Sequence, residues 1–128
     1  MIGHSLGGIV GRLALDRPGG ERVLRLVTLG TPHRGAYAPV QALRGVYPLV
    51  RRVAQLDPFH SAEELAERVF ATFPSLYQML PADAEHPLSD LAAWPADSPR
   101  PRPELLARAA LHEPPAALRE RIHCIAGH

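Results

Sequence analysis

The first third of the chain contains one helical and one strand-like pattern of apolar residues. Apolar side chains recur over residues 6–16 (Leu6, Ile9, Val10, Leu13, Ala14) at the spacing of one helix face. The run from Asp16 to Gly20 contains Pro and Gly and ends this helix. Residues 23–29 are almost continuously apolar, as in a strand covered on both faces. This order predicts most of a right-handed βαβ unit, with a first strand that is missing or reduced to Met1-Ile2.

Prolines recur throughout residues 36–117, and short helices fit between them. Ser61 to Glu64 has the sequence of a capping box, followed by apolar residues at helical spacing. Residues 86–103 are Pro-rich and predict an irregular surface stretch that contains Trp94. Further elements are expected near the end of the chain: short helices at 104–111 and 115–121, and a strand at 122–127.

The fold class that these patterns predict is α/β, in one incomplete domain with three parts. Residues 1–35 contain the first helix and the strand after it, and residues 118–128 return to the sheet. A structureless loop spanning residues 36–117 would be implausible in a compact domain, so we expect a mostly helical insertion there.

Composition excludes several classes of function. The formal net charge is +1, from 14 basic and 13 acidic residues, which provides no basic field for nucleic acid. The longest apolar runs fall short of the roughly 20 residues that span a bilayer, so no transmembrane segment is expected. Cys124 is the single cysteine, and His, Asp and Glu show no metal-ligand spacing, so no metal or cofactor is expected.

Gly3-His4-Ser5-Leu6-Gly7-Gly8 matches the G-x-S-x-G pattern of a nucleophile elbow. In such an elbow a serine occupies a strained strand-to-helix turn that exposes its hydroxyl at the edge of the sheet. Gly3 and Gly7 would remove side chains that clash where strand and helix approach, and Gly8 would let the helix settle further onto the strand.

The helix that begins at Leu6 would direct the positive end of its dipole toward Ser5. The backbone N–H of Leu6 would then form half of an oxyanion hole. Two other interpretations of the motif are a glycine-rich turn in which Ser5 only caps the helix, and a phosphate-binding turn. The second lacks the lysine and glycine spacing that phosphate loops use.

The elbow, the strand after it and the turn Gly30-Thr31-Pro32-His33-Arg34-Gly35 resemble lipases and esterases of the α/β-hydrolase superfamily. The similarity is closest to the lecithin–cholesterol acyltransferase-like branch, which has a Gly-Thr-Pro-x-x-Gly turn at this point. The segment from Pro74 to Pro81 is similar to a Pro-Ser-…-Leu-Pro segment in the lid or cap of that branch. The insertion would then be a lid.

The resemblance implies a serine enzyme that acts on carboxylic esters, with a lipid or other small ester as substrate. Ser5 would form an acyl-enzyme, and the triad acid and histidine would follow later in the chain order. We expect neither triad partner in these 128 residues, which would make the chain a fragment with little activity alone. Transfer of the acyl group to an alcohol instead of water, and a non-catalytic remnant, are the alternatives.

We assign no role in the chemical step to the remaining candidate residues. Thr31 and His33 could border an acyl pocket, although His33 also fits a plain turn residue. We expect His4 to pack beside the elbow, and Asp57 and Asp83 to be turn residues. Solvated histidines are expected at positions 60, 86 and 112, and His128 follows the last strand. A set of apolar residues could line an acyl pocket or form the core of the insertion: Tyr47, Leu49, Val50, Phe59, Phe70, Phe73, Leu76, Tyr77 and Met79.

Overall fold

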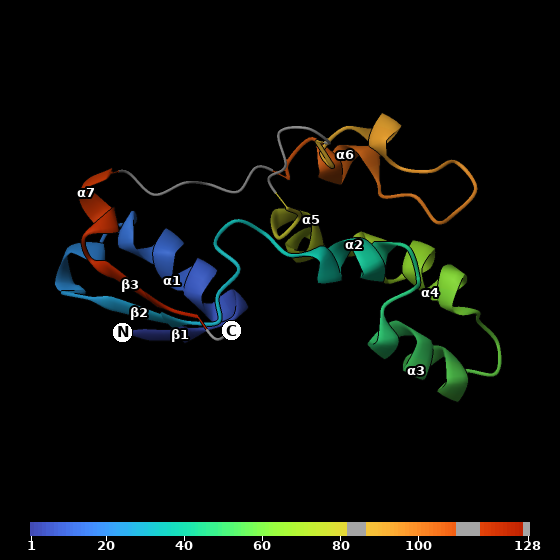
Figure 1. The fold of residues 1–128 in the computed structure, drawn as a ribbon, viewed down its shortest axis with the longest axis horizontal. Coiled ribbons are helices and arrows are strands. Elements are labelled where there is room, and N and C mark those ends of the chain that lie inside the picture. Colours follow the sequence, from blue (N-terminus) through green and yellow to red (C-terminus); the bar gives the residue numbers. More distant parts are fainter. Residues whose placement is uncertain (82–86, 110–115, 127–128) are drawn as a thin grey trace. The chain divides into compact units, whose positions relative to one another are not determined.

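The structure, a computed structural model, describes residues 1–81, 87–109 and 116–126 (Figure 1). The chain forms two compact units. One comprises Met1–His33 with His112–His128 and contains the sheet, and the other, Arg34–Leu111, is helical. Within the described ranges, no helix combines the length and the apolar character that a membrane crossing requires.

The first unit is built on three parallel strands in the order β1-β2-β3. These strands are β1 (Ile2–His4), β2 (Leu26–Leu29) and β3 (Ile122–Ile125), with α1 (Leu6–Leu15) connecting the first two. Helix α7 (Ala116–Arg119) precedes β3. The first strand is therefore longer than the expected Met1-Ile2. The parallel β1-α1-β2 arrangement agrees with the predicted α/β class.

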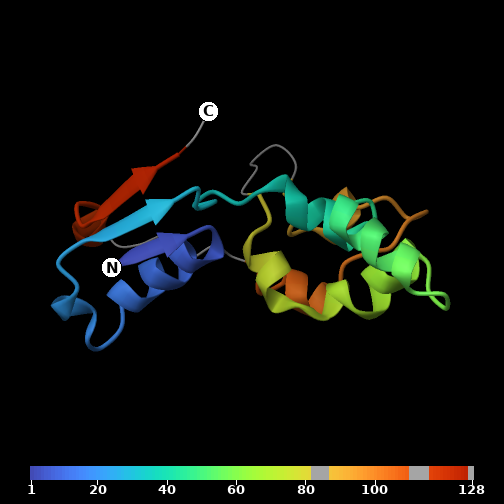
Figure 2. The ribbon, with the colours of Figure 1, turned by 90° about the horizontal axis from the view of Figure 1, so that it is seen from below.

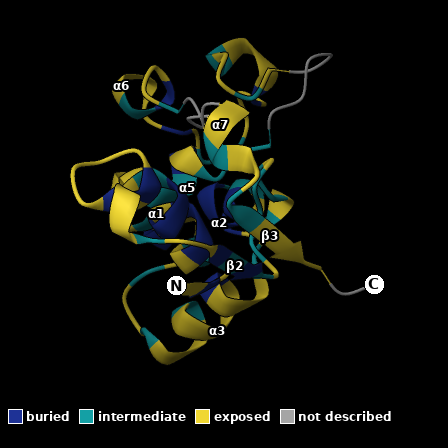
Figure 3. Ribbon diagram, turned by 90° about the vertical axis from the view of Figure 1, so that its left-hand side faces the viewer, coloured by how far each residue is buried: buried dark blue, intermediate teal, exposed yellow. Residues whose placement is uncertain are grey.

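Helix α1 lies against the sheet (Figure 2). It packs there through its glycines and a few large side chains. Its buried residues are Gly8, Ile9, Gly11, Arg12 and Leu15, whereas Val10 and Ala14 are exposed. The expected apolar stripe is thus rotated, because the glycines face the sheet and allow a close approach. A Cβ atom on Gly11 would lie 3.0 Å from Leu26 Cδ1 of β2. The outer strand β3 is mostly exposed (Figure 3).

The strand expected at 23–29 begins only at Leu26. The preceding residues form a short 3-10 turn, η1 (Gly20–Arg22), and the Val23 N–H donates to the Gly20 carbonyl at 3.1 Å. Leu24 was expected in a buried strand because it is apolar, but it is 85% exposed. The Arg121 guanidinium donates to the carbonyls of Gly20 and Val23, which links this turn to the start of β3.

The helical unit consists of short elements, three of which begin at a proline. Proline suits the first turn of a helix because its missing N–H has no partner there in any case. In chain order the elements are α2 (Tyr37–Leu43), α3 (Pro48–Leu56), α4 (Ala62–Arg68), η2 (Phe70–Thr72), α5 (Pro74–Gln78), η3 (Leu91–Ala93) and α6 (Pro103–Leu106). The helix expected at 104–111 is therefore shorter, and residues 110 and 111 lie outside the described ranges.

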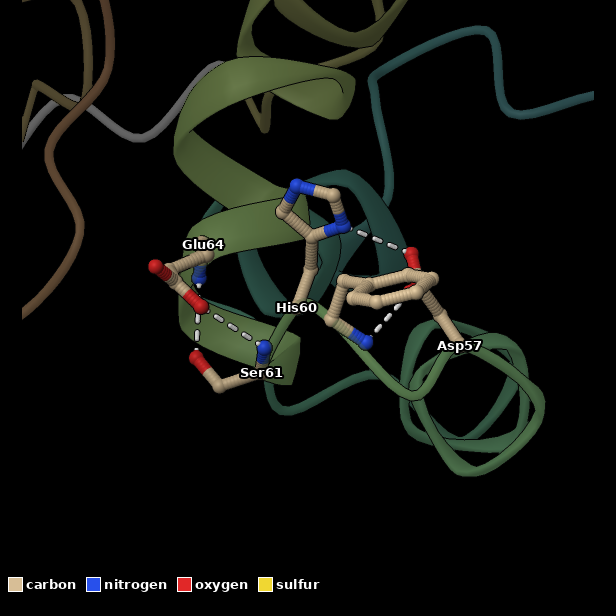
Figure 4. Close-up of polar contacts among 5 residues, drawn as sticks. Asp57, His60, Ser61 and Glu64 are labelled. Carbon is tan, nitrogen blue, oxygen red and sulfur yellow. Dashed lines mark hydrogen bonds and ion pairs between the residues drawn. The ribbon is translucent and has the colours of Figure 1, made fainter.

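The connection between α3 and α4 is held by local side-chain hydrogen bonds (Figure 4). The predicted capping box is present: Ser61 Oγ accepts the Glu64 N–H at 3.2 Å, and Glu64 Oε2 accepts the Ser61 N–H at 2.9 Å. Asp57 accepts the Phe59 N–H and lies 2.8 Å from His60 Nδ1, which lowers the pKa of Asp57. His60 was expected to be solvated, but it is half-buried and bonded to this carboxylate.

Two small clusters form the core of the helical unit. One contains Tyr77, Leu80 and Trp94, and the other contains Val50 and Leu65. Trp94 was expected on an irregular surface, but it is 3% exposed, and its Nε1 donates to the Leu88 carbonyl at 2.9 Å. Of the apolar set that the sequence left open, Val50 and Tyr77 are buried, whereas Leu49, Phe59 and Phe73 are exposed.

The Tyr77 hydroxyl joins two segments of the helical unit. It donates to the Ala71 carbonyl at 2.8 Å and accepts the Arg102 N–H at 2.9 Å. Burial of the ring raises the pKa of this phenol, so the hydroxyl stays protonated and can donate.

We expect Tyr77→Phe to lower the free energy of unfolding of this unit by about 1–3 kcal/mol, because the buried Ala71 carbonyl and the part-buried Arg102 N–H lose their partner. Trp94 lies in the same cluster, so its fluorescence during urea unfolding measures this unit. Tyr37→Phe is the matched control, because Tyr37 is 64% exposed. Equal unfolding midpoints for the two variants would contradict the bridging role of Tyr77.

Candidate active site

Ser5 occupies the junction between β1 and α1 in a conformation that serine rarely adopts. Its φ is 50° and its ψ is −125°, and no other non-glycine residue in the described ranges has a positive φ. Such a backbone costs about 1–3 kcal/mol, so it persists only where surrounding contacts hold it. The Ser5 N–H donates to the Leu29 carbonyl of β2 at 2.9 Å, and the Ser5 carbonyl accepts the Gly8 N–H at 3.0 Å.

The Ser5 side chain is exposed and makes no capping hydrogen bond, although Ser5 stands at the N-cap position of α1. A serine selected for capping would accept an N–H of the first turn through its hydroxyl. Ser61 does so at the start of α4. The geometry therefore argues against the capping interpretation of Ser5.

The elbow glycines differ in what they permit. A Cβ on Gly3 would lie 2.7 Å from both the Gly7 carbonyl oxygen and Gly8 Cα, so only glycine fits. A Cβ on Gly8 would overlap the Thr31 side chain, so Gly8 makes room for that residue of the next turn. A Cβ on Gly7 would meet nothing within 4 Å. The expectation that Gly7 relieves a clash is wrong, because this position faces away from the strand.

Leu6 is the first residue of α1. The N–H groups in the first turn of a helix have no acceptor within that helix, and the helix dipole is positive at this end. The Leu6 N–H directly follows Ser5 in the chain. Together they offer an exposed hydroxyl next to a backbone donor, which is the pair that acyl transfer needs.

The turn after β2 lies beside this junction and is fixed by backbone hydrogen bonds. Gly30 has a φ of 53°, and its N–H donates to the Ile125 carbonyl of β3 at 2.9 Å. The His33 N–H donates to the Thr31 carbonyl at 2.9 Å. Thr31 is half-buried against Gly8, and its Oγ1 is buried without a hydrogen-bond partner in the described part of the chain.

His33 belongs to a polar network beneath the turn. His33 Nε2 lies 3.0 Å from Thr28 Oγ1, and His33 Nδ1 lies 3.4 Å from Arg12 Nη1, which also contacts the His33 carbonyl at 3.4 Å. A guanidinium can only donate, so Nδ1 accepts and the ring proton is on Nε2, where it donates to Thr28. Burial of the ring, and then the Arg12 charge, lower the pKa of His33.

Arg12 and Thr28 were not identified from the sequence. Arg12 is 5% exposed and Thr28 is 1% exposed. A signal existed for Arg12, because it follows Gly8 by four residues and Ile9 by three, the spacing of one helix face. A buried arginine on that face requires polar partners. The turn residue His33 supplies two of them, so it does more than form a turn.

The other sequence candidates are exposed, pair with each other or lie outside the described ranges. His4 and His123 are exposed on β1 and β3. Asp57 and His60 pair within the helical unit. Across residues 1–81, 87–109 and 116–126, no group of three or more His, Cys, Asp or Glu side chains could hold a metal ion. Four candidates fall outside the described ranges: Asp83, His86, His112 and His128.

Gly35 and the segment from Pro74 to Pro81 meet within the helical unit. Gly35 has a φ of 86°, and a Cβ on it would lie 2.6 Å from Pro81 Cα. The Ala36 N–H donates to the Met79 carbonyl at 2.9 Å. The end of the Gly30–Gly35 turn is therefore packed against the end of the Pro74–Pro81 segment.

The parallel sheet and the strained serine between strand and helix define an α/β domain. The family described as "PGAP1-like alpha/beta domain" matches residues 1–73, and the chain belongs to this family. The match supports a hydrolase-like family of α/β type and includes the elbow, α1, β2 and the helices through η2. No curated protein and no solved structure matches the chain.

The elbow glycines give a matched pair of substitutions. We expect Gly3→Ala to lower the free energy of unfolding by about 1–3 kcal/mol, because its Cβ would displace the backbone of α1. Gly7→Ala should leave stability unchanged or raise it by up to about 1 kcal/mol, because alanine favours helix and its Cβ meets no neighbour. Urea unfolding followed by far-ultraviolet circular dichroism measures both. The same loss in both variants would contradict the close approach at Gly3.

The lowered pKa of His33 predicts a pH-dependent stability. The folded protein protonates His33 less readily than the unfolded chain, whose pKa is near the ordinary 6.5. As pH falls below that value, the unfolded chain gains protons first and the fold loses stability, until the folded form also protonates His33. We expect His33→Gln to unfold with a weaker pH dependence between neutral pH and about pH 5. Parallel curves for the two proteins would refute this assignment.

Proposed function

We propose that this protein is a serine hydrolase of carboxylic esters, with lipid esters as its substrate class and Ser5 as its nucleophile. The observation that carries the proposal is the Ser5 backbone, held at a φ of 50° with an exposed side chain that does not cap α1. Strain at a residue with no structural use for its side chain is typical of functional sites. Membership of a hydrolase-like α/β family supports the same conclusion.

In this mechanism the Ser5 Oγ attacks the ester carbonyl carbon and its proton passes to a base. The carbonyl oxygen becomes an oxyanion, which accepts the Leu6 N–H and a second donor and lies near the positive end of α1. Collapse of the tetrahedral intermediate releases the alcohol and leaves the acyl group on Ser5. Water then attacks the acyl-enzyme and releases the carboxylic acid.

His33 does not fit the role of the base. Both of its ring nitrogens are engaged, one by Thr28 and one by Arg12. A catalytic histidine needs a free Nε2 to accept the serine proton and an acid that stabilises its protonated form, whereas Arg12 disfavours that form. We assign His33 to positioning the turn that carries Thr31, at the border of the acyl pocket. We propose that neither the triad acid nor the triad histidine is among the residues that the structure describes.

Acyl transfer to an alcohol is the second candidate function. It uses the same acyl-enzyme, and its support is the contact between Gly35 and the Leu80-Pro81 end of the Pro74–Pro81 segment. Both segments resemble the lecithin–cholesterol acyltransferase-like branch. A comparison of water with added alcohol acceptors would separate the two reactions, because only a transferase would form a new ester at the expense of free acid.

We expect the purified chain to hydrolyse a chromogenic ester no faster than its Ser5→Ala variant, because a serine without its base loses most of its activation. In a protein that contains this domain together with the triad histidine, a fluorophosphonate should label Ser5. Ser5→Ala should abolish labelling and Ser89→Ala should not, since Ser89 is also exposed. Labelling that survives Ser5→Ala would refute the nucleophile. If the chain alone gives a burst of ester hydrolysis that Ser5→Ala removes, the hypothesis that the chain lacks the catalytic base is wrong.

A further inference from the structure

The core of the helical unit covers only part of the apolar face of helix α3. Successive residues of a helix lie about 100° apart around its axis. Val50 is fully buried and Ala54 half-buried, and both belong to the cluster packed with α4. Farther around the helix, Leu49, Val53 and Leu56 fall within an arc of about 60°. All three are exposed.

Exposed apolar residues also lie immediately before and after α3 in the chain. Val46 precedes the helix and is exposed, and Phe59 follows it and is 83% exposed. Leu56, at the end of the helix, is 86% exposed. We call Val46, Leu49, Val53, Leu56 and Phe59 the α3 apolar face. Figure 3 shows α3 mostly in the colour of exposed residues.

The charges around this face are mostly positive, and the exception is Asp57, which lies between Leu56 and Phe59 in the chain. Arg51 and Arg52 are exposed on the polar side of α3, and Arg44 ends α2. No acidic residue occurs from position 22 to position 56, whereas α4 carries Glu63, Glu64 and Glu67. Residues 34–56 are therefore a basic, amphipathic segment.

A basic amphipathic helix is typical of two kinds of contact, a membrane surface or a protein that wraps around the helix. Wrapping would require α3 to be free on all sides, but Val50 and Ala54 attach it to the core. A bilayer needs only one exposed face, with cationic side chains near the headgroups and apolar side chains inserted between them. We propose that the α3 apolar face, with Arg52 at its border, docks on an anionic lipid bilayer. This contact does not depend on the chemistry of Ser5.

The test is co-sedimentation of the chain with vesicles of an equimolar mixture of phosphatidylcholine and phosphatidylserine. We expect binding of the wild type, and Leu56→Gln with Phe59→Gln should weaken it about ten-fold or more by removing inserted apolar surface. Arg52→Gln should weaken it roughly five-fold, with little effect on pure phosphatidylcholine vesicles. Arg51→Gln should weaken it less, because Arg51 lies on the opposite side of the helix from the apolar face. Added salt should weaken binding of the wild type more than binding of the arginine variants.

Two controls keep the outcomes distinct. Leu24→Gln removes an equally exposed leucine, at 85%, from the other unit and should bind as the wild type does. Ser5→Ala should also bind normally, so failure of the proposed hydrolase and failure of membrane docking are separate results. Absence of vesicle binding by the wild type would overturn the proposal, as would unchanged binding of the Leu56/Phe59 variant. Self-association that this variant abolishes, without vesicle binding, would assign the face to a second copy instead.

Discussion

The backbone of Ser5 is the constraint on which the α/β unit depends. At a φ of 50°, the chain turns from β1 into α1 within one residue, so strand and helix must lie almost in contact. This proximity requires glycine at position 3, and the room left by Gly8 is filled by Thr31 from the turn after β2. The hydrogen bond from the Ser5 N–H to the Leu29 carbonyl ties the strained residue to the central strand. The contacts that offset the strain therefore also bring the turn after β2 next to the serine.

A buried arginine stabilises the same region from the opposite side of the turn. Arg12 lies on the face of α1 that packs on the sheet, where a charge requires hydrogen-bond acceptors to offset its desolvation. His33 accepts hydrogen bonds from Arg12 at its Nδ1 and its carbonyl, and Thr28 Oγ1 accepts a hydrogen bond from the His33 Nε2–H. The network holds His33 neutral and binds helix, strand and turn together. His33 thus has a structural role, which removes it as a candidate for the catalytic base.

The helical unit depends on tertiary packing, because none of the helices described in it is long enough to be stable alone. Prolines and caps define where the helices begin, and burial of Tyr77 and Trp94 in one cluster holds distant segments together. The Tyr77 hydroxyl satisfies backbone groups of Ala71 and Arg102, so the core of this unit is partly polar. The part of α3 that this small core leaves uncovered is the surface that we propose contacts lipid.

The sequence by itself was sufficient for features that depend on neighbouring residues. The Gly3–Gly8 motif predicted the turn from strand to helix, Ser61 and Glu64 predicted a capping box, and the pattern around residues 6–29 predicted a parallel α/β unit. These are local because spacing and side-chain type alone determine the backbone there. The tertiary structure decided which side chains are covered. Arg12 and Trp94 are buried, Gly8 and not Gly7 faces Thr31, and Leu49 and Leu56 are exposed. Burial depends on which distant segment packs against a residue, and the residue's own neighbours in the chain do not specify that.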